Sequence, residues 1–515
     1  MVTKKYDAVI IGAGTAGLAV GAILAAKEHK KVLVMEREEH VGGRLVSFVG
    51  KENAISLLDK ELDARGFEAA LRAVNTWLVR SKPGLPTMIK RGLLDGYTFE
   101  AGVHATFWGN KGRAACLLDY LGKHTELPGN EGYAIVDPKD NKWHRVEKRG
   151  KYGWMTDEAD KETKRLLREM ASVPLKEAEK YELMSFGQWL KGRTSNRQAY
   201  EYLKALCSIH MSISEPDMQP FGDFLRFMMI AKDIGMDLVT GSTGTGPRPG
   251  LIQIAVRLAE ALRDNDGEIM LGTPVEEVII EDRKAKGVTV QTKGGLKRIE
   301  AGSVVCTVPV KGILKVIPER HFPSNFVKKI NERFWNIGML SAYIGLKRNI
   351  IEDKDVNPKS WLVVPALIRE EEGYTGDVDI VMFMSSNWTN RAPAGKHLWE
   401  FSIALLGEEL RDKKKVNRVI DAVTAFMQRN FPTWGDDVDW QLWTASQGFG
   451  PCAPIGERRP DVKCPWVDGL YFAGDGYGVR RWGVGIDGAV QSAVLCVDSM
   501  TGKNYLSEIL PAYHR

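Results

Sequence analysis

One segment near the amino terminus constrains the fold of this chain more than any other. Residues 6–11, YDAVII, form an apolar and β-branched run of strand length, which ends at the glycine turn G-A-G-T-A-G at 12–17. Small apolar residues typical of a helix follow the turn, and a second strand-like run occupies residues 31–35. This order of strand, glycine turn, helix and strand predicts a βαβ unit in a parallel sheet.

Each glycine of the turn has a physical role in nucleotide binding. Gly12 permits the tight turn, Gly14 lets the backbone approach a pyrophosphate, and Gly17 allows the helix to pack closely on the strand. The predicted helix begins at Thr15 and Ala16, where unpaired backbone N–H groups favour an anion. We therefore expect a phosphate group at this turn.

An acidic residue at the end of the second strand completes the pattern. Glu36 lies 24 residues after Gly12, where its carboxylate can accept both hydrogen bonds of an adenosine ribose. The strand, the helix, the second strand and the acid together favour a dinucleotide site over an ordinary glycine-rich turn.

The residues that follow this acid indicate which dinucleotide binds. The segment E-R-E-E-H-V-G-G-R at 36–44 resembles the flavoprotein superfamily of phytoene desaturases and flavin amine oxidases, and is closer to the phytoene desaturase branch. In that family a Gly-Gly-Arg wraps the FAD pyrophosphate, and the resemblance implies this role for Gly42, Gly43 and Arg44. An arginine fork pairs with two phosphate oxygens, and glycines allow backbone N–H contacts. Arg37 is included in the predicted FAD site because it adjoins the ribose-binding acid.

Two distant segments extend the resemblance over most of the chain. Residues 269–309 predict three strands separated by a charged hairpin and a turn. They look like the mid-chain flavin-domain strands of the family, which implies that the backbone of Val275 contacts adenine. Near the carboxyl terminus, residues 469–475 (GLYFAGD) predict a strand, and residues 483–493 predict a loop and a glycine-rich helix start.

The carboxyl-terminal segment supplies the remaining residues of the predicted cofactor site. The resemblance implies that Gly474 and Asp475 lie near the ribityl and pyrophosphate groups. It also implies that the helix start at Gly485 and Ile486 points its N–H groups at the flavin pyrimidine. A positive helix end there would stabilise an anionic reduced flavin.

These segments predict an α/β fold in which a three-layer, Rossmann-like FAD-binding domain is interleaved with an α+β substrate-binding domain. The first substrate piece is helix-rich, and its Met- and Phe-rich stretch at 205–238 has two explanations. One is core packing, and the other is an apolar substrate tunnel or a membrane-facing entrance. The expected FAD-binding pieces are 1–107 (with a mixed helical insertion at 51–96), 241–325 and 440–505; the expected substrate-binding pieces are 108–240 and 326–439, and 506–515 is a carboxyl-terminal tail.

Charge and hydropathy narrow the partners of the chain. A net charge of +5, from 71 Lys and Arg against 66 Asp and Glu, predicts no nucleic-acid-binding surface. The uncharged run at 8–26 imitates a membrane span, but its spaced glycines favour the βαβ unit. We therefore expect a cytoplasmic protein whose membrane association, if it has one, is peripheral.

The six cysteines are scattered, with no C-x-x-C pair and no histidine at metal-ligand spacing. Reduced thiols and no metal site are therefore expected. Cys452 raises the alternative of covalent flavin attachment, but its spacing to the F-A-G-D strand favours a free thiol.

Two segments are candidates for the chemistry at the flavin. Residues 99–104, FEAGVH, resemble the turn that returns the family's chain toward the flavin ring, with Glu100 in place of the family's Asp. His104 would then lie close to the ring, where it is a candidate proton acceptor, and a structural histidine is the alternative. In the loop before the last helix, Arg480 and Arg481 are candidates to hold a substrate carbonyl or carboxylate, and Trp482 is a candidate pocket wall. The alternative for both arginines is exposure to solvent or binding of FAD phosphate.

Comparison with amine oxidases favours a different substrate. Those enzymes have a cage tyrosine where this chain has Gly485, and a flavin-facing lysine where this chain offers Met339 or Leu340. The leading interpretation is an FAD-dependent enzyme that takes a hydride from a largely apolar carbon skeleton, an isoprenoid or an alicyclic carbonyl or acid compound, and forms a C=C bond.

Three other functions remain as alternatives. They are an amine oxidase that releases peroxide, a non-oxidative isomerase or saturase, and a non-catalytic binding protein that resembles the GDP-dissociation inhibitors. The electron acceptor, which is O2, a quinone or another carrier, and the oligomeric state are left open by the sequence.

Overall fold

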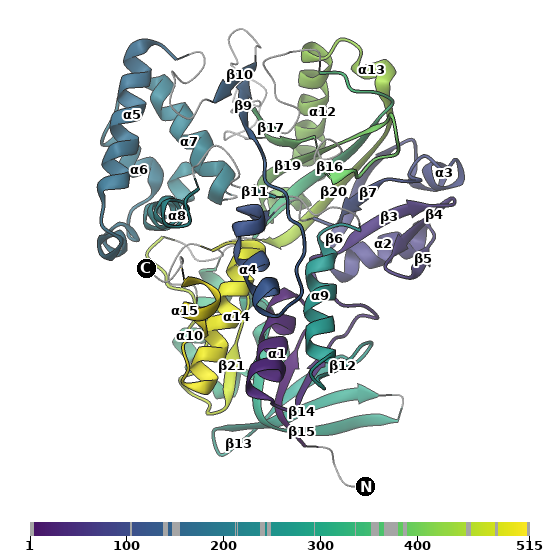
Figure 1. Cartoon of the computed structure of the whole chain (residues 1–515), viewed down its shortest axis with the longest axis vertical. Coiled ribbons are helices and arrows are strands. Elements are labelled where there is room, and N and C mark those ends of the chain that lie inside the picture. Colours follow the sequence, from purple (N-terminus) through teal and green to yellow (C-terminus); the bar gives the residue numbers. More distant parts are fainter. Residues whose placement is uncertain are drawn as a thin grey trace.

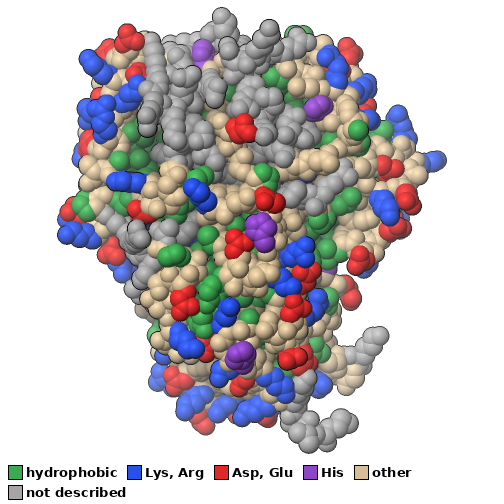
Figure 2. Space-filling model, in the orientation of Figure 1, with side chains coloured by type: hydrophobic (Ala, Val, Ile, Leu, Met, Phe, Trp, Pro, Cys, Tyr) green, Lys and Arg blue, Asp and Glu red, His purple; other side chains and the backbone are tan. Residues whose placement is uncertain are grey.

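The computed structural model describes most of the chain, as a body built around two large sheets (Figure 1). Within the described residues, no helix combines the length and the apolar character that crossing a bilayer requires. On the face shown in Figure 2, acidic and basic side chains are interspersed. The described residues are 5–102, 106–136, 143–146, 155–211, 213, 215–236, 243–244, 249–292, 294–334, 336–351, 360–364, 380–384, 389–449, 455–478 and 483–511.

The predicted dinucleotide fold is confirmed by a seven-stranded sheet. Its order is β12-β2-β1-β15-β14-β13, and β21 pairs with β15. The central strands β2, β1, β15 and β21 are parallel, whereas β13, β14 and β15 form the expected antiparallel hairpins. The strands are β1 (Lys5–Ile11), β2 (Val32–Met35), β12 (Glu268–Met270), β13 (Val275–Glu281), β14 (Lys284–Thr292), β15 (Gly295–Cys306) and β21 (Leu470–Phe472).

Helices cover one face of this sheet and give the fold its layers. Because α1 is apolar on all sides, it is buried between the sheet and its neighbours α9 and α14. The other face packs against the region that contains α10. The helices are α1 (Thr15–Glu28), α4 (Arg113–Tyr120), α9 (Ile252–Arg263), α10 (Ser324–Glu332), α14 (Gly485–Thr501) and α15 (Tyr505–Ile509).

The insertion at 51–96 contains strands as well as helices. It follows β3 and precedes β7, which pair in a small four-stranded sheet of order β5-β4-β3-β7. Its last strand, β6, leaves this small sheet and pairs with β20 of the second large sheet. The elements are β3 (Ser47–Lys51), β4 (Ala54–Leu57), β5 (Lys60–Leu62), α2 (Ala64–Ala73), β6 (Thr76–Lys82), α3 (Leu85–Lys90) and β7 (Thr98–Glu100).

The second large sheet has eight strands in the order β10-β9-β17-β18-β19-β16-β20-β6. One of its faces packs on α12. The division of the chain into domain pieces stays a prediction, but β6 and β20, which it assigned to the FAD-binding pieces, pair with each other in this sheet. The remaining elements of this region are β9 (Gly132–Val136), β10 (Trp143–Val146), β16 (Ile337–Leu346), β17 (Ser360–Val364), β18 (Ile380–Phe383), β19 (His397–Leu406), α12 (Lys413–Asn430), α13 (Trp434–Asp437) and β20 (Val438–Phe449).

Helices α5, α6, α7 and α8, from the first predicted substrate-binding piece, lie beside the sheets, and we term them the arm (Figure 1). The phenylalanines of α8 are fully buried in the main core, which agrees with core packing of the Met- and Phe-rich stretch. A short antiparallel pair, β8 and β11, brings residues 243–244 beside residues 106–107. The elements are β8 (Thr106–Phe107), α5 (Asp157–Ser172), α6 (Phe186–Lys191), α7 (Arg197–Met211), α8 (Phe221–Asp233) and β11 (Thr243–Gly244).

Candidate functional site

The two glycine loops predicted from the sequence lie against each other. Gly14 and Gly42 form an isolated β-bridge, and the Gly42 N–H donates to the Ala13 carbonyl at 2.9 Å. A Cβ on Gly43 would lie 3.2 Å from the Gly14 Cα atom, and Gly43 has a positive φ of 57°. Side chains are therefore excluded between the loops, which lets a phosphate approach the backbone there.

The third glycine of the first loop packs the helix on the strand. A Cβ on Gly17 would lie 2.0 Å from the Gly12 carbonyl oxygen, which is closer than any side chain permits. Thr15 and Ala16, at the start of α1, are buried beside it. The first turn of α1 therefore directs its N–H groups toward the loop.

Glu36 lies at the end of β2, as expected, and is 7% exposed. Its Oε2 accepts from the Ala13 N–H at 2.8 Å and its Oε1 from the Glu38 N–H at 3.0 Å. Each carboxylate oxygen keeps a further lone pair, so the group can still accept from a ribose. The Thr273 N–H donates to the Glu36 carbonyl at 2.8 Å, which places the segment leading to Val275, the first residue of β13, beside the acid.

The side chain of Arg37 contacts the end of α2 in the insertion. Its Nη2 donates to the Ala73 carbonyl at 2.7 Å, its Nε lies 3.0 Å from Glu38 Oε1, and its side chain is 66% exposed. Arg37 therefore ties the end of β2 to the last residue of α2 in the insertion. In this structure its guanidinium makes a structural contact.

Arg44 and Asp475 meet across 431 positions of sequence. The Arg44 Nη2 donates to Asp475 Oδ1 at 3.0 Å. The second oxygen of Asp475, Oδ2, is buried and has no hydrogen-bond partner in the part of the chain that the structure describes. The adjacent Gly474 N–H donates to the Ser492 hydroxyl at 3.2 Å, which fixes this strand end on α14. A buried carboxylate oxygen without a partner is costly, so a bound polar group is expected to complete it.

Sequence reasoning missed Arg459, which holds both ends of the loop before α14. Its Nη1 donates to the Asp475 carbonyl and to the Gly483 carbonyl, each at 2.9 Å. No motif surrounds Arg459, because its two acceptors are backbone oxygens that any residue supplies.

The amino terminus of α14 is open and anchored. A Cβ on Gly485 would meet no described atom within 4 Å, and Gly485 has a φ of 53°. Ile486 follows and is 6% exposed. The buried Asp487 then accepts from the Thr106 hydroxyl at 3.1 Å and from the Phe107 N–H at 3.0 Å. The helix start is therefore fixed, and no described atom occupies the place of a side chain at Gly485.

Asp487 was not identified from the sequence either. Its second oxygen accepts from the Arg113 N–H at 3.2 Å. Burial raises the pKa of this carboxyl, and the Arg113 guanidinium opposes the rise. The aspartate thus ties α14 to the strand β8 and to the start of α4.

Glu100 is buried and bonded to residues of other elements. It is 1% exposed, and its Oε1 lies 2.6 Å from Arg391 Nη2 and accepts from the Leu251 N–H at 3.0 Å at the start of α9. Arg391 also pairs with Glu400 at 3.2 Å, and the Tyr343 hydroxyl donates to the Glu100 carbonyl. Burial raises the pKa of Glu100, and Arg391 opposes this. The residue therefore joins the cofactor part to the eight-stranded sheet.

The predicted chemical residues fall into two groups. His104, Arg480, Arg481, Trp482 and Cys452 lie outside the described residues. Of the two residues at the amine oxidase lysine position, Leu340 is fully buried beneath α12, whereas Met339 lies half-buried on the opposite face of β16. Within the described residues, no group of His, Cys, Asp and Glu side chains is placed to hold a metal ion.

These residues fit a flavin dinucleotide. A buried acid lies where the ribose is expected, and two glycine loops keep side chains away from the backbone between them. Next to the loops lie Arg44 and Asp475, whose Oδ2 has no partner among the described residues. Beyond them lies the amino terminus of α14, where Gly485 has no side chain. The set runs in the order adenosine, pyrophosphate and ring, which is the order of groups in FAD.

Solved structures share this fold at low sequence identity. An oxidoreductase from Methanosarcina mazei matches with a TM-score of 0.68 and 17% identity, covering 97% of this chain and 100% of that one. Putrescine oxidase bound to putrescine matches with a TM-score of 0.61 and 16% identity, covering 97% and 100%. Rab GDI from Plasmodium falciparum matches with a TM-score of 0.57 and 13% identity, covering 98% and 99%. At these identities the likeness shows the fold alone.

Comparison of sequences gives the family. The tRNA uridine 5-carboxymethylaminomethyl modification enzyme MnmG of Malacoplasma penetrans is 35% identical over 96 residues, which is 18% of this chain and 16% of that relative. The model of the family described as flavin containing amine oxidoreductase matches residues 15–501. The chain therefore belongs to the flavin containing amine oxidoreductase family, which confirms the expected α/β fold and the expected FAD-dependent oxidoreductase.

Proposed function

We propose that this protein is an FAD-dependent dehydrogenase that forms a C=C bond in a largely apolar carbon skeleton, an isoprenoid or an alicyclic compound with a carbonyl or acid group. The partners that we propose are this small molecule and an electron acceptor, which is O2, a quinone or another carrier. Peripheral membrane contact would suit an apolar substrate.

One observation carries the proposal: the sheet face that fronts the cofactor part has an uncharged centre. Met339 lies on this face, half-buried, at the position where the amine oxidases have a lysine. Its directly paired neighbours among the described residues, Ser446 on β20 and Ala404 on β19, are uncharged. Gly485, in place of the cage tyrosine, removes one wall of an amine-binding cage. An uncharged site suits an apolar substrate.

The residues of the cofactor site have distinct proposed roles. Glu36 accepts from the adenosine ribose, the glycine loops and Arg44 hold the pyrophosphate, and Asp475 binds the ribityl side. The start of α14 presents backbone N–H groups to the ring, and bound FAD supplies the hydride-accepting N5 position.

The substrate-side roles follow from the sequence. His104 is the proposed acceptor of the substrate proton, and Arg480 and Arg481 are proposed to hold its carbonyl or carboxylate, with Trp482 as a wall.

Flavin absorbance during anaerobic titration tests the function. The purified protein, loaded with FAD, is titrated with isoprenoid and alicyclic ketones and acids, and separately with amines. We expect bleaching of the flavin by a ketone or acid and none by amines. Bleaching by amines alone would contradict the proposal and favour the oxidase alternative, and a protein that cannot be loaded with FAD would contradict both.

Glu36→Ala tests the cofactor assignment separately. The loss of two hydrogen bonds to a charged group should weaken FAD binding by at least roughly tenfold. Equilibrium dialysis measures this affinity, with Glu38→Ala, a neighbouring carboxylate, as the control. Equal FAD affinity in Glu36→Ala and the wild type would contradict the ribose role.

A further inference from the structure

A row of three hydroxyl side chains lies on the eight-stranded sheet, on the face opposite α12. We term Ser341, Thr444 and Ser446 the hydroxyl row. Ser341 on β16 pairs directly with Thr444 on β20, and Ser446 pairs with Met339. Directly paired residues of antiparallel strands share one face. The alternate residues, such as Leu340, belong to the core under α12, so the row faces the other way.

Two contacts place the hydroxyl row in front of the cofactor part. Tyr343, two positions beyond Ser341, donates its hydroxyl to the Glu100 carbonyl. Gly448, two positions beyond Ser446, lies so that a Cβ on it would be 3.6 Å from Arg44 Nη1. The row therefore spans the interval between the Glu100 junction and the proposed pyrophosphate arginine. The flavin ring is expected in this interval.

The same face is not fully covered by the rest of the chain. Met339, Ser402 and Ala404 lie on this face in the two central strands, and each keeps part of its surface exposed. On the opposite face, the side chains of Leu340 and Ile403 are completely buried. A central sheet region that is open on one face only indicates a space there for a bound group.

Two hydroxyls of the row, those of Thr444 and Ser446, are buried and make no hydrogen bond with the described residues. Thr444 and Ser446 are each 1% exposed, and the Thr444 Oγ1 and the Ser446 Oγ have no hydrogen-bond partner among the described residues. A buried hydroxyl without a partner is destabilising, because it has lost its hydrogen bonds to water. Two such groups side by side on one face point to a ligand that accepts from them.

We propose that the hydroxyl row donates hydrogen bonds to a carbonyl oxygen of a group bound between the sheet and the cofactor part. The row carries no charge, so it suits a neutral oxygen better than an ammonium, which needs charged or aromatic partners. The carbonyl belongs either to the substrate or to the flavin ring. The substrate case rests on the proposed function, which places a ketone or acid at this site.

Two variants, Thr444→Val and Ser446→Ala, remove the hydroxyls with little change in shape. The FAD affinity and absorption spectrum of each variant report the flavin carbonyl. The dissociation constant of β-ionone, an isoprenoid ketone, is measured from the flavin spectral shift and reports the substrate carbonyl. We expect one of these affinities to fall roughly five- to tenfold, which is the effect of one lost hydrogen bond. Thr163→Val, a buried threonine of α5 whose hydroxyl lies 3.6 Å from the Met155 sulfur, is the control.

The outcomes separate the two sources of the carbonyl. Weaker FAD binding or a shifted flavin spectrum assigns the row to the flavin, and a weaker β-ionone response with normal FAD binding assigns it to the substrate. Variants that match the wild type and the Thr163→Val control in FAD affinity, spectrum and β-ionone response would overturn the proposal. The proposed function is tested by bleaching with ketones against amines, so it can fail while the row still contributes to FAD affinity.

Discussion

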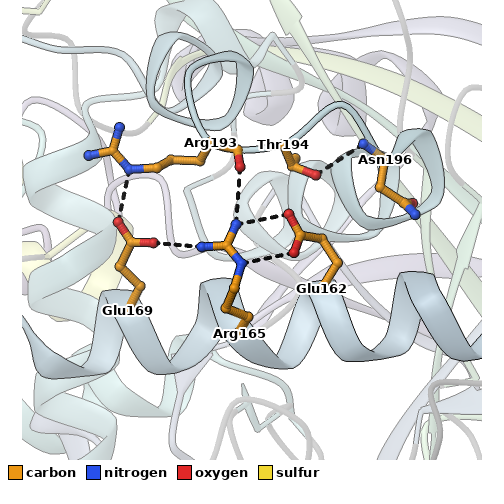
Figure 3. A network of polar contacts seen from close by, with 6 residues as sticks. All are labelled: Glu162, Arg165, Glu169, Arg193, Thr194 and Asn196. Carbon is orange, nitrogen blue, oxygen red and sulfur yellow. Dashed lines mark hydrogen bonds and ion pairs between the residues drawn. The ribbon is translucent and has the colours of Figure 1, made fainter.

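Two arginines of this protein each pair with two glutamates. One of the two arginines lies at the surface and the other in the interior. In the arm, Arg165 pairs with Glu162 at 2.8 Å and with Glu169 at 3.2 Å, and its side chain is 46% exposed (Figure 3). Between the small four-stranded sheet and the eight-stranded sheet, Arg391 pairs with Glu100 of β7 and Glu400 of β19, and all three side chains are at most 1% exposed.

The comparison teaches that the environment of an ion pair sets its energetic importance. Water screens the Arg165 network, which links α5 to the turn after α6 through Arg193. The Arg391 group is removed from water, so each charge depends on the others for compensation. Similar pairings should therefore respond very differently to the removal of the arginine.

Removal of the buried arginine should have the largest effect. Arg391→Met leaves Glu100 and Glu400 buried without a positive charge, so the free energy of unfolding should fall by about 3–5 kcal/mol. Urea denaturation followed by circular dichroism measures this loss. A loss below about 1 kcal/mol would remove the distinction between the two arginines.

A buried carboxylate held mainly by backbone N–H groups extends the comparison. Asp487→Asn should lower the free energy of unfolding by about 2–3 kcal/mol, because its donors and the buried Arg113 lose a negative acceptor. Urea denaturation is again the measurement. Asp119→Asn, on the exposed side of α4, is the matched control, and an equal loss in both variants would contradict the role of burial.

The junction should also respond to pH through Glu100. Burial raises the pKa of Glu100 in the folded protein above its ordinary value of 4.5, so the folded state holds this proton more tightly than the unfolded state does. The stability from this group is present below pH 4.5 and is lost as pH rises through the raised pKa. Glu100→Gln removes the titration, so the wild type should lose stability relative to this variant as pH rises through the raised pKa. Parallel unfolding curves of the two proteins across pH 4–8 would refute this.

Removal of the exposed arginine should have the smallest effect. Arg165→Met should change the free energy of unfolding by less than about 1 kcal/mol, and the change should shrink further in high salt. Urea denaturation at low and high NaCl checks this. A large loss that persists in salt would show that the arm depends on its surface network.

Local patterns predicted the cofactor part of the fold well. The strand at 6–11, the helix after it and the acid Glu36 form one continuous unit, so their spacing reports their geometry directly. The mid-chain hairpins and α14 were also predicted, because strand-like runs separated by a charged hairpin and a glycine-rich helix start mark them in the sequence. The roles of individual site residues stay predictions, and those of His104 and the 480–482 segment lie outside the described residues.

Residues with distant partners could not be found from the sequence. Glu100 resembled a flavin-facing acid, but its partner Arg391 lies 291 positions away. Asp487 and Arg459 form their bonds largely with backbone groups, which leave no signature in the sequence. β6 lies in the insertion but pairs with β20 of the second large sheet. The residues of a strand alone do not show which strand it pairs with.

The two bonds of Arg459 have a consequence for how the substrate range of this protein can change. Because Arg459 holds the carbonyls of Asp475 and Gly483, the ends of the loop between them are fixed by a residue outside the loop. Tyr477, within that loop, is 1% exposed, stacks on Phe472 of β21 and donates its hydroxyl to the Val308 carbonyl at 2.6 Å. The loop is therefore fastened at both ends and at Tyr477, so directed engineering of its side chains should leave Arg459 and Tyr477 in place to preserve the cofactor framework.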